Sequence, residues 1–202
     1  MMKKNHNIDV LNYILYILYI LNYQKNMKLT PTMQKFVLHW GEMGTRWGVN
    51  RTVAQIHALL YLASEPLTAE DITETLGVAR SNVSTSLKEL QTWGLVKTTH
   101  VLGDRRDHFN SHKDVWDIFM IITEERKRRE IDPTLTMLRE CSLESASDTS
   151  TPEDVKKRME KTLEFLELLT SWSDQIKKMP RPTLVRIMKM GAKIQNFLGK
   201  KK

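Results

Sequence analysis

The sequence predicts a mainly α-helical protein with a small β-hairpin wing: a winged helix-turn-helix domain followed by helical dimerisation elements. Helix-forming Leu, Met, Lys and Glu dominate the 202 residues. Two short helical patterns flank Gly77 with almost no linker, and β-branched residues follow Gly94. We expect an atypical apolar extension over residues 1–26, an N-terminal helix and winged helix-turn-helix domain over 27–112, and a helical dimerisation region over 113–202.

The composition is that of a globular protein with a basic surface. Hydrophobic residues make up 41% of the chain and charged residues 27%, with a formal net charge of +7. Such a charge predicts a polyanionic partner, although it says nothing about the fold. The single cysteine, Cys141, excludes an intramolecular disulfide, and nothing argues for secretion, so we expect a cytoplasmic protein.

The first 26 residues differ from the rest of the chain. Two lysines precede an apolar run from Ile8 to Leu21, which is interrupted by Asp9 and Asn12. The run has no small-residue cleavage site after it and is shorter than a membrane-spanning helix. Three interpretations stay open: an interfacial membrane anchor, an extra helix packed on the dimer, or the product of a misassigned start codon, with Met27 as the true start. We favour the last and do not expect a membrane partner.

The region from residue 51 to residue 93 has the pattern of a helix-turn-helix. A first helix over about 51–63 precedes a capping-type start at Thr68, with Asp71 three residues later. The short helix that follows ends at Gly77, where a left-handed backbone is needed. A second helix then runs from about residue 80 to residue 93, with Val83, Leu87 and Leu90 on its inner face.

The outer face of the second helix is rich in short polar side chains. Solvated helix faces favour Glu and Lys, whereas this run of Ser, Asn and Thr has poor helix propensity. Such side chains can reach base edges in a major groove, while Arg and Lys can reach phosphate or guanine. The candidate DNA-binding residues of this helix are Arg80, Ser81, Asn82, Ser84, Thr85 and Lys88.

Two strands follow, over 95–101 and 106–110, and form the predicted wing. Arg105 in the turn between them and Arg106 at the start of the second strand lie at the tip, and we expect both to enter a minor groove. An ordinary charged hairpin is the alternative, in which Asp104 or Asp107 pairs with one arginine. Such a pair would hold one arginine in place and leave the other available to DNA.

Four segments together resemble the MarR superfamily of winged-helix transcriptional regulators, specifically its GbsR-like branch. The resemblance implies a homodimeric repressor or activator whose second helix and wing contact DNA. It extends from about Met27 through the helix after Asp114, and more loosely to the end. The operator cannot be transferred, because the second helix departs from the family at several positions. The segments are 79–84 (ARSNVS), 87–90 (LKEL), 93–96 (WGLV) and 103–109 (GDRRDHF).

Further helices flank this domain and predict a two-fold dimer. Upstream, residues 33–44 are amphipathic, and we expect Gly41, Gly44 and Gly48 to share one face that another helix approaches closely. Downstream, Asp114 caps a helix with Val115, Phe119 and Ile122 facing inward. A polar loop over 142–151 and helices over 152–178 and 183–198 complete the prediction. The long helix carries an apolar stripe of Leu163, Leu166, Leu169 and Trp172.

The sequence contains no motif for catalysis, metal binding or a cofactor, so we expect neither an enzyme nor a metalloprotein. A small-molecule effector is a separate hypothesis, because aromatic side chains can enclose a quaternary ammonium group. Ordinary hydrophobic core is the competing interpretation of the same residues. The candidate effector-binding residues are Trp40, Met43, Trp47, Trp116 and Phe119.

These observations predict a homodimeric regulator, more specifically a repressor, that binds double-stranded DNA at a specific operator. The recognition helix would enter the major groove and the wing the minor groove. Two alternatives stay open: a winged helix that binds protein without sequence-specific DNA contacts, and a membrane-tethered regulator. The basic wing and the small polar helix face argue against the first.

Overall fold

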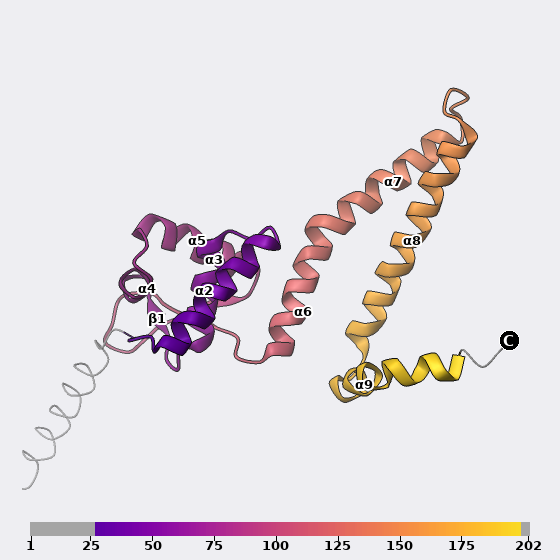
Figure 1. The fold of residues 1–202 in the computed structure, drawn as a ribbon. Coiled ribbons are helices and arrows are strands. Elements are labelled where there is room, and N and C mark those ends of the chain that lie inside the picture. The colour runs from indigo at the N-terminus through magenta and orange to yellow at the C-terminus, as the bar shows by residue number, and fades with distance from the viewer. Residues whose placement is uncertain (1–26, 199–202) are drawn as a thin grey trace, which may run out of the picture. The chain divides into compact units, whose positions relative to one another are not determined.

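A computed structural model of the chain describes residues 27–198, and side chains only as far as residue 190. The predicted N-terminal extension, residues 1–26, lies outside the described residues. The chain divides by its packing into two units, the first ending at Ile122 and the second beginning at Thr123. Figure 1 shows the order of the elements along the chain.

Four helices form most of the first unit. The first of them begins after Thr30, whose side chain accepts a hydrogen bond from the Met33 amide at 3.3 Å. The next begins after Asn50, whose side chain caps the Thr52 amide at 2.8 Å. Both caps satisfy amides that have no partner within the helix. The helices are α2 (Pro31–Arg46), α3 (Arg51–Leu62), α4 (Ala69–Leu76) and α5 (Arg80–Thr92).

The helix-turn-helix consists of α4, Gly77 and α5, as predicted. The Thr68 hydroxyl accepts from the Asp71 amide at 3.2 Å, and the Asp71 carboxylate accepts from the Thr68 amide at 2.8 Å. This reciprocal capping box fixes the start of α4. Gly77 ends the helix with φ +63°, a left-handed conformation that strains residues with a Cβ. The predicted cap and glycine turn are both confirmed.

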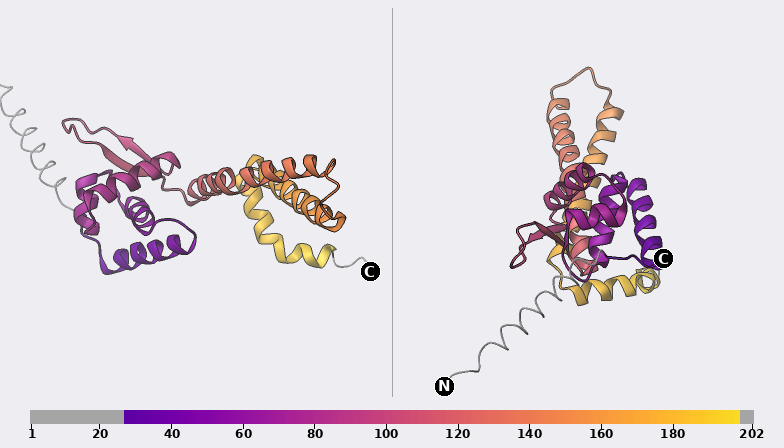
Figure 2. Two further views of the ribbon diagram at one scale, coloured as in Figure 1. Left: turned by 90° about the horizontal axis from the view of Figure 1, so that it is seen from above. Right: turned by 90° about the vertical axis from the view of Figure 1, so that its left-hand side faces the viewer.

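The wing belongs to a three-stranded antiparallel sheet with strand order β1-β3-β2. Strands β2 (Val96–Thr99) and β3 (His108–Ser111) form the predicted hairpin, which projects from the helices of the first unit in Figure 2. The sequence did not predict β1 (Leu67–Thr68), which pairs Leu67 with Phe109. Two residues are too few for a period-two pattern, so tertiary pairing alone reveals this strand.

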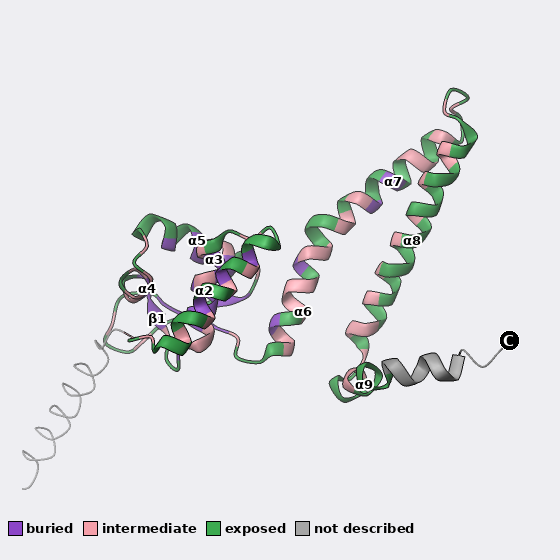
Figure 3. Cartoon of the chain, viewed as in Figure 1, coloured by how far each residue is buried: buried purple, intermediate pink, exposed green. Residues whose placement is uncertain are grey.

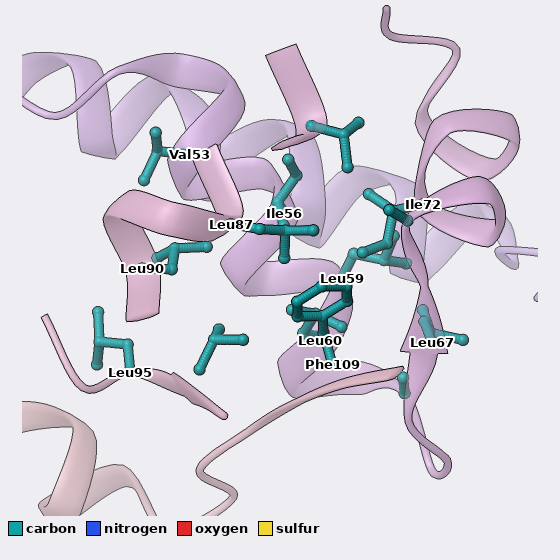
Figure 4. Close-up of a cluster of buried hydrophobic side chains, with 14 of the residues drawn as sticks. Val53, Ile56, Leu59, Leu60, Leu67, Ile72, Leu87, Leu90, Leu95 and Phe109 are labelled. Carbon is teal, nitrogen blue, oxygen red and sulfur yellow. The ribbon is translucent and has the colours of Figure 1, made fainter. Parts of the chain in front are cut away.

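One hydrophobic core unites these elements. Ile56 and Leu59 of α3 are fully buried, and Val83 and Leu87 come from the inner face of α5. Figure 4 shows Ile56, Leu59 and Leu87 gathered in one cluster with Leu67 and Phe109 of the sheet. The inner face predicted for the second helix is therefore confirmed, and its burial determines which side chains of α5 face outward.

Two of the three glycines predicted to permit close helix packing do so. A Cβ on Gly44 would lie 2.5 Å from the Cβ of Ala54, and one on Gly41 would lie 2.6 Å from Cγ of Gln55. Both neighbours belong to α3, so the glycines let α2 approach it. The prediction was wrong for Gly48, which lies beyond the end of α2 with φ +76° and has open space around it.

The helix after Asp114 forms, but with a different inner face from the one predicted. Asp114 accepts from the Trp116 amide at 2.8 Å and begins α6 (Val115–Arg126). Ile118 is buried in the core, whereas Val115 and Phe119 are more than half exposed. Ile122 is half-buried against the same core, as predicted. The prediction for Val115 and Phe119 was wrong because this helix is apolar on several sides, which leaves its orientation to packing.

The second unit is a helical hairpin followed by a further helix. A five-residue π-helical turn, η1 (Lys127–Ile131), leads into α7 (Asp132–Ser145), which packs against α8 (Glu153–Lys178). Arg139 of α7 donates two hydrogen bonds to Glu167 of α8, at 2.9 and 3.0 Å. Helix α7 continues to Ser145, so the loop predicted from residue 142 begins later. The last helix is α9 (Arg181–Leu198).

Much of the apolar surface of the second unit is exposed. Leu135 and Leu138 of α7 are buried, whereas α8 has no buried residue, as the pink and green of Figure 3 show. Of the predicted α8 stripe, Leu163 and Leu166 are half-buried, and Leu169 and Trp172 are exposed. Within residues 27–198, none of the helices combines the length and the apolar character needed to cross a membrane.

Candidate nucleic-acid interface

The outer face of α5 presents every polar residue of this helix that the sequence predicted to bind DNA. Ser81 and Asn82 lie in its first turn, and Ser84, Thr85 and Lys88 follow on the same exposed side. They face outward because Val83, Leu87 and Leu90 are buried on the opposite side. The helix N-terminus adds the partial positive charge of its free amides, which favours a phosphate nearby.

Arg80, the first residue of α5, is not free in this structure. Its guanidinium forms an ion pair with the carboxylate of Glu70, in the first turn of α4, and both side chains are about half exposed. The sequence placed Arg80 on the DNA-binding face but did not predict this partner. The arginine therefore has to exchange Glu70 for a phosphate or a base before it can contact DNA.

The two wing arginines have different environments. The Arg106 guanidinium donates to both oxygens of Asp104, at 3.0 Å from Nε and 2.5 Å from a terminal nitrogen. The Arg106 amide also donates to Asp104, at 3.0 Å. These bonds hold the pKa of Asp104 well below its usual range. The pairing of Asp104 with one wing arginine, weighed from the sequence, is thus present, while Arg105 is exposed at the tip.

His108, the first residue of β3, contacts two residues of the wing. It is fully buried, its Nδ1 lies 3.0 Å from the carbonyl oxygen of Arg106, and its Nε2 lies 3.6 Å from Asp104. On the other strand, Thr98 accepts a hydrogen bond from the side-chain amide of Gln91 in α5, at 2.8 Å. The wing is therefore joined to the recognition helix as well as to the sheet.

A groove of about 290 Å³ lies between the start of α4, the outer face of α5 and the wing. Arg80 and Arg106, each paired with a carboxylate, line it together with two further residues of the α5 face and two acidic residues. Its charge is therefore mixed. The lining includes Glu70, Arg80, Ser84, Lys88, Arg106 and Asp107.

The candidate effector residues separate into two aromatic groups. Trp40 stacks on Phe36 at a centroid distance of 5.3 Å and lies 6.5 Å from the ring of His57. Trp116 and Phe119 meet edge to face at 6.4 Å. Trp47 is more than half exposed, and Met43 is half-buried. None of the five predicted residues lines either of the two cavities described, so an effector site at these residues stays a prediction.

His57 is a buried titratable group outside the DNA-binding face. It is 4% exposed, and its pKa is lowered to about 4 by burial first and then by the charges of His112 and Lys113. Lys113 donates to the carbonyl oxygens of Leu60 and Ala63 at 2.5 Å each, at the end of α3. Among the described residues, no group of three or more His, Cys, Asp or Glu side chains could hold a metal ion.

Comparisons with known proteins agree with this fold. A family model described as the MarR family matches residues 47–107, which run from the end of α2 into the wing. The HTH-type transcriptional repressor GbsR of Bacillus subtilis (strain 168) is 24% identical over 136 residues, 66% of this chain and 75% of the repressor. A crystal structure of a transcriptional regulator aligns with a TM-score of 0.56 and 18% identity, over 72% of this chain and 95% of that one.

A polar outer helix face beside a basic wing, on a three-helix core, defines a winged helix-turn-helix DNA-binding protein. The family match covers the same elements that carry this surface. From residue 47 to residue 107 the chain is similar to the MarR family of regulators, and over 136 residues it is similar to the repressor GbsR.

Proposed function

We propose that this protein is a homodimeric transcriptional repressor that binds a specific two-fold operator. Helix α5 of each protomer enters a major groove through Ser81, Asn82, Ser84 and Thr85, with Arg80 and Lys88 on bases or phosphates. Arg105 and Arg106 of each wing enter the adjacent minor groove. The observation that carries the proposal is that all eight residues are exposed and that four of them, Arg80, Ser84, Lys88 and Arg106, line one groove.

The dimer supplies what one domain lacks. A single winged helix reads only a few base pairs, whereas two copies related by a two-fold axis read two half-sites. The second unit carries a helical stripe of exposed apolar side chains that a second copy of this chain would bury. This stripe, which we call the α8 stripe, consists of Phe165, Leu168, Leu169 and Trp172.

Repression rather than activation follows the similarity to the B. subtilis repressor. We assign the protein a regulatory role without enzymatic activity and place it in the cytoplasm. A small-molecule effector held by Trp40, Met43, Trp47, Trp116 and Phe119 would release or strengthen DNA binding. This part of the proposal is carried only by the aromatic character of four of these five residues, all except Met43.

The test is selection of bound sequences from a pool of random duplexes by the full chain, at several salt concentrations. A two-fold symmetric motif that persists at physiological salt is the expected result. Binding that stays blind to sequence and disappears as salt rises would reduce the interaction to phosphate attraction and overturn the proposal. Repression is then measured with a reporter gene whose promoter contains the selected motif.

A further inference from the structure

We propose that Glu70 restrains Arg80 in the free protein and thereby suppresses binding to non-operator DNA. This inference rests on the proposed function and names a residue that lowers its sequence-blind affinity for DNA. Glu70 lies outside the recognition helix, in the first turn of α4. The structure places it against the arginine that begins the recognition helix.

The geometry puts Glu70 where DNA would contact the protein. It lies in the first turn of α4, pairs with Arg80 and lines the groove between α5 and the wing. Arg106 of the wing lines the same groove, so Glu70 shares it with an arginine from each of the two proposed DNA-binding elements.

An ion pair that is half exposed contributes little to folding stability, so the pair can exchange partners. On any DNA, Arg80 gains a phosphate or a base only by leaving Glu70, and Glu70 then faces the negative backbone. A specific operator compensates this cost through base contacts of the neighbouring side chains. Non-operator DNA offers phosphates alone, so the same cost is not compensated there and sequence-blind binding stays weak.

The experiment measures the dissociation constant of the full chain for a duplex of shuffled sequence, across a salt series. Glu70→Gln keeps the side-chain size and removes the charge. Its matched control is Glu74→Gln, which removes the same charge one turn further along α4, away from the groove. We expect Glu70→Gln to tighten shuffled-duplex binding about tenfold and to steepen the salt dependence by about one phosphate contact.

A second background separates restraint of Arg80 from a general change in charge. In an Arg80→Ala protein, Glu70→Gln should tighten binding no more than Glu74→Gln does, because the restrained side chain is gone. With the selected operator as a second duplex, Glu70→Gln should also tighten operator binding, because the pair has to break on either duplex. Thermal melts of each variant report whether the fold is retained.

Three results would overturn the inference: equal effects of Glu70→Gln and Glu74→Gln, weaker binding by Glu70→Gln, or a Glu70 effect that survives in the Arg80→Ala background. Failure of the proposed function has a different signature, namely a wild-type protein with no operator preference. The shuffled-duplex measurements still decide the role of Glu70 in that case, since they need no operator.

Discussion

At the residue scale, Asn82 and Arg106 are expected to play different parts in DNA binding. Asn82 is exposed in the first turn of α5, where an amide can bond to a base edge, while Arg106 is on the wing. Asn82→Ala should relax base preference at one position, at a cost of about 1–3 kcal/mol for the preferred base. Arg106→Ala should weaken binding to all sequences and reduce the salt slope by about one. Both are measured by titrating operator and shuffled duplexes.

An Asn82→Ala protein that keeps full discrimination would remove Asn82 from the base-reading set. The prediction for Arg106 has a control variant at Asp104, because both carboxylate oxygens of Asp104 accept hydrogen bonds from the Arg106 guanidinium. Asp104→Asn keeps the arginine but weakens its restraint, so it should affect affinity less than Arg106→Ala.

The buried His57 makes folding stability depend on pH. Its pKa is lowered from 6.5 to about 4 by burial and the neighbouring positive charges, so the unfolded chain binds a proton more readily than the folded one. Stability should be fully present above pH 6.5 and fall as the pH drops toward 4, by up to roughly 3 kcal/mol. Denaturant titrations between pH 7.5 and 4.5 measure the loss.

Replacing His57 with Leu should flatten this part of the pH profile, because the buried group then carries no proton. His39→Gln is the matched control, since His39 is exposed on α2. An unchanged slope in the His57→Leu protein would assign the acid sensitivity to other groups.

The sequence could identify which residues of the second helix face outward but not which partners they have. The inner positions of the second helix are hydrophobic at helical spacing, so the outward positions follow from the period. The Arg80–Glu70 pair joins two helices across ten residues and a turn, and its geometry depends on the angle between them. Asp104 is only two residues from Arg106, so that pair could be weighed from the sequence.

At the scale of elements, local signals were sufficient where a specific residue type is required. The capping box at Thr68 and the left-handed turn at Gly77 have such requirements, and both were predicted. The orientation of α6 and the short strand β1 require no specific residue type. Each depends instead on contacts with residues that are distant in the sequence. Gly48 belongs to the same class: its spacing suited the helix face, but the helix had already ended.

The contact between α2 and α3 provides a test at this scale. A Cβ on Gly44 would lie 2.5 Å from the Cβ of Ala54, a contact that requires one helix to move. Gly44→Ala should therefore lower the free energy of unfolding by about 1–3 kcal/mol, although alanine is the better helix former. Lys35→Ala on an exposed position of α2 should change it by less than about 0.5 kcal/mol. Increased stability of Gly44→Ala would contradict the close approach.

At the scale of the whole molecule, the two units differ in what they carry and in how they are packed. The first carries the recognition helix, the wing and the core that positions them. The second buries few of its own apolar side chains, which is what the proposed dimer interface requires. The sequence predicted a helical dimerisation region, but spacing alone did not identify its exposed face. Leu163 and Leu166 are half-buried, whereas Phe165 and Leu168, two positions further along, are exposed.

The α8 stripe gives the dimer a direct test. Leu168 is 67% exposed and Trp172 is 60% exposed, one turn apart on the same side of α8. A charge buried in an interface is costly, so Leu168→Glu should raise the dimer dissociation constant at least tenfold. Light scattering over a concentration series measures the shift from dimer to monomer. Ser171→Glu adds the same charge at an exposed position outside the stripe and should leave the dimer intact.

The same variant connects assembly to operator binding. If two half-sites are read by one dimer, the Leu168→Glu protein should lose operator affinity at nanomolar concentrations and regain part of it where the dimer reforms. Its affinity for a duplex with a single half-site should be close to that of the unmodified chain, because the recognition helix is untouched. A Leu168→Glu protein that is monomeric yet binds the full operator with unchanged affinity would show that one protomer suffices, and would separate the α8 stripe from DNA recognition.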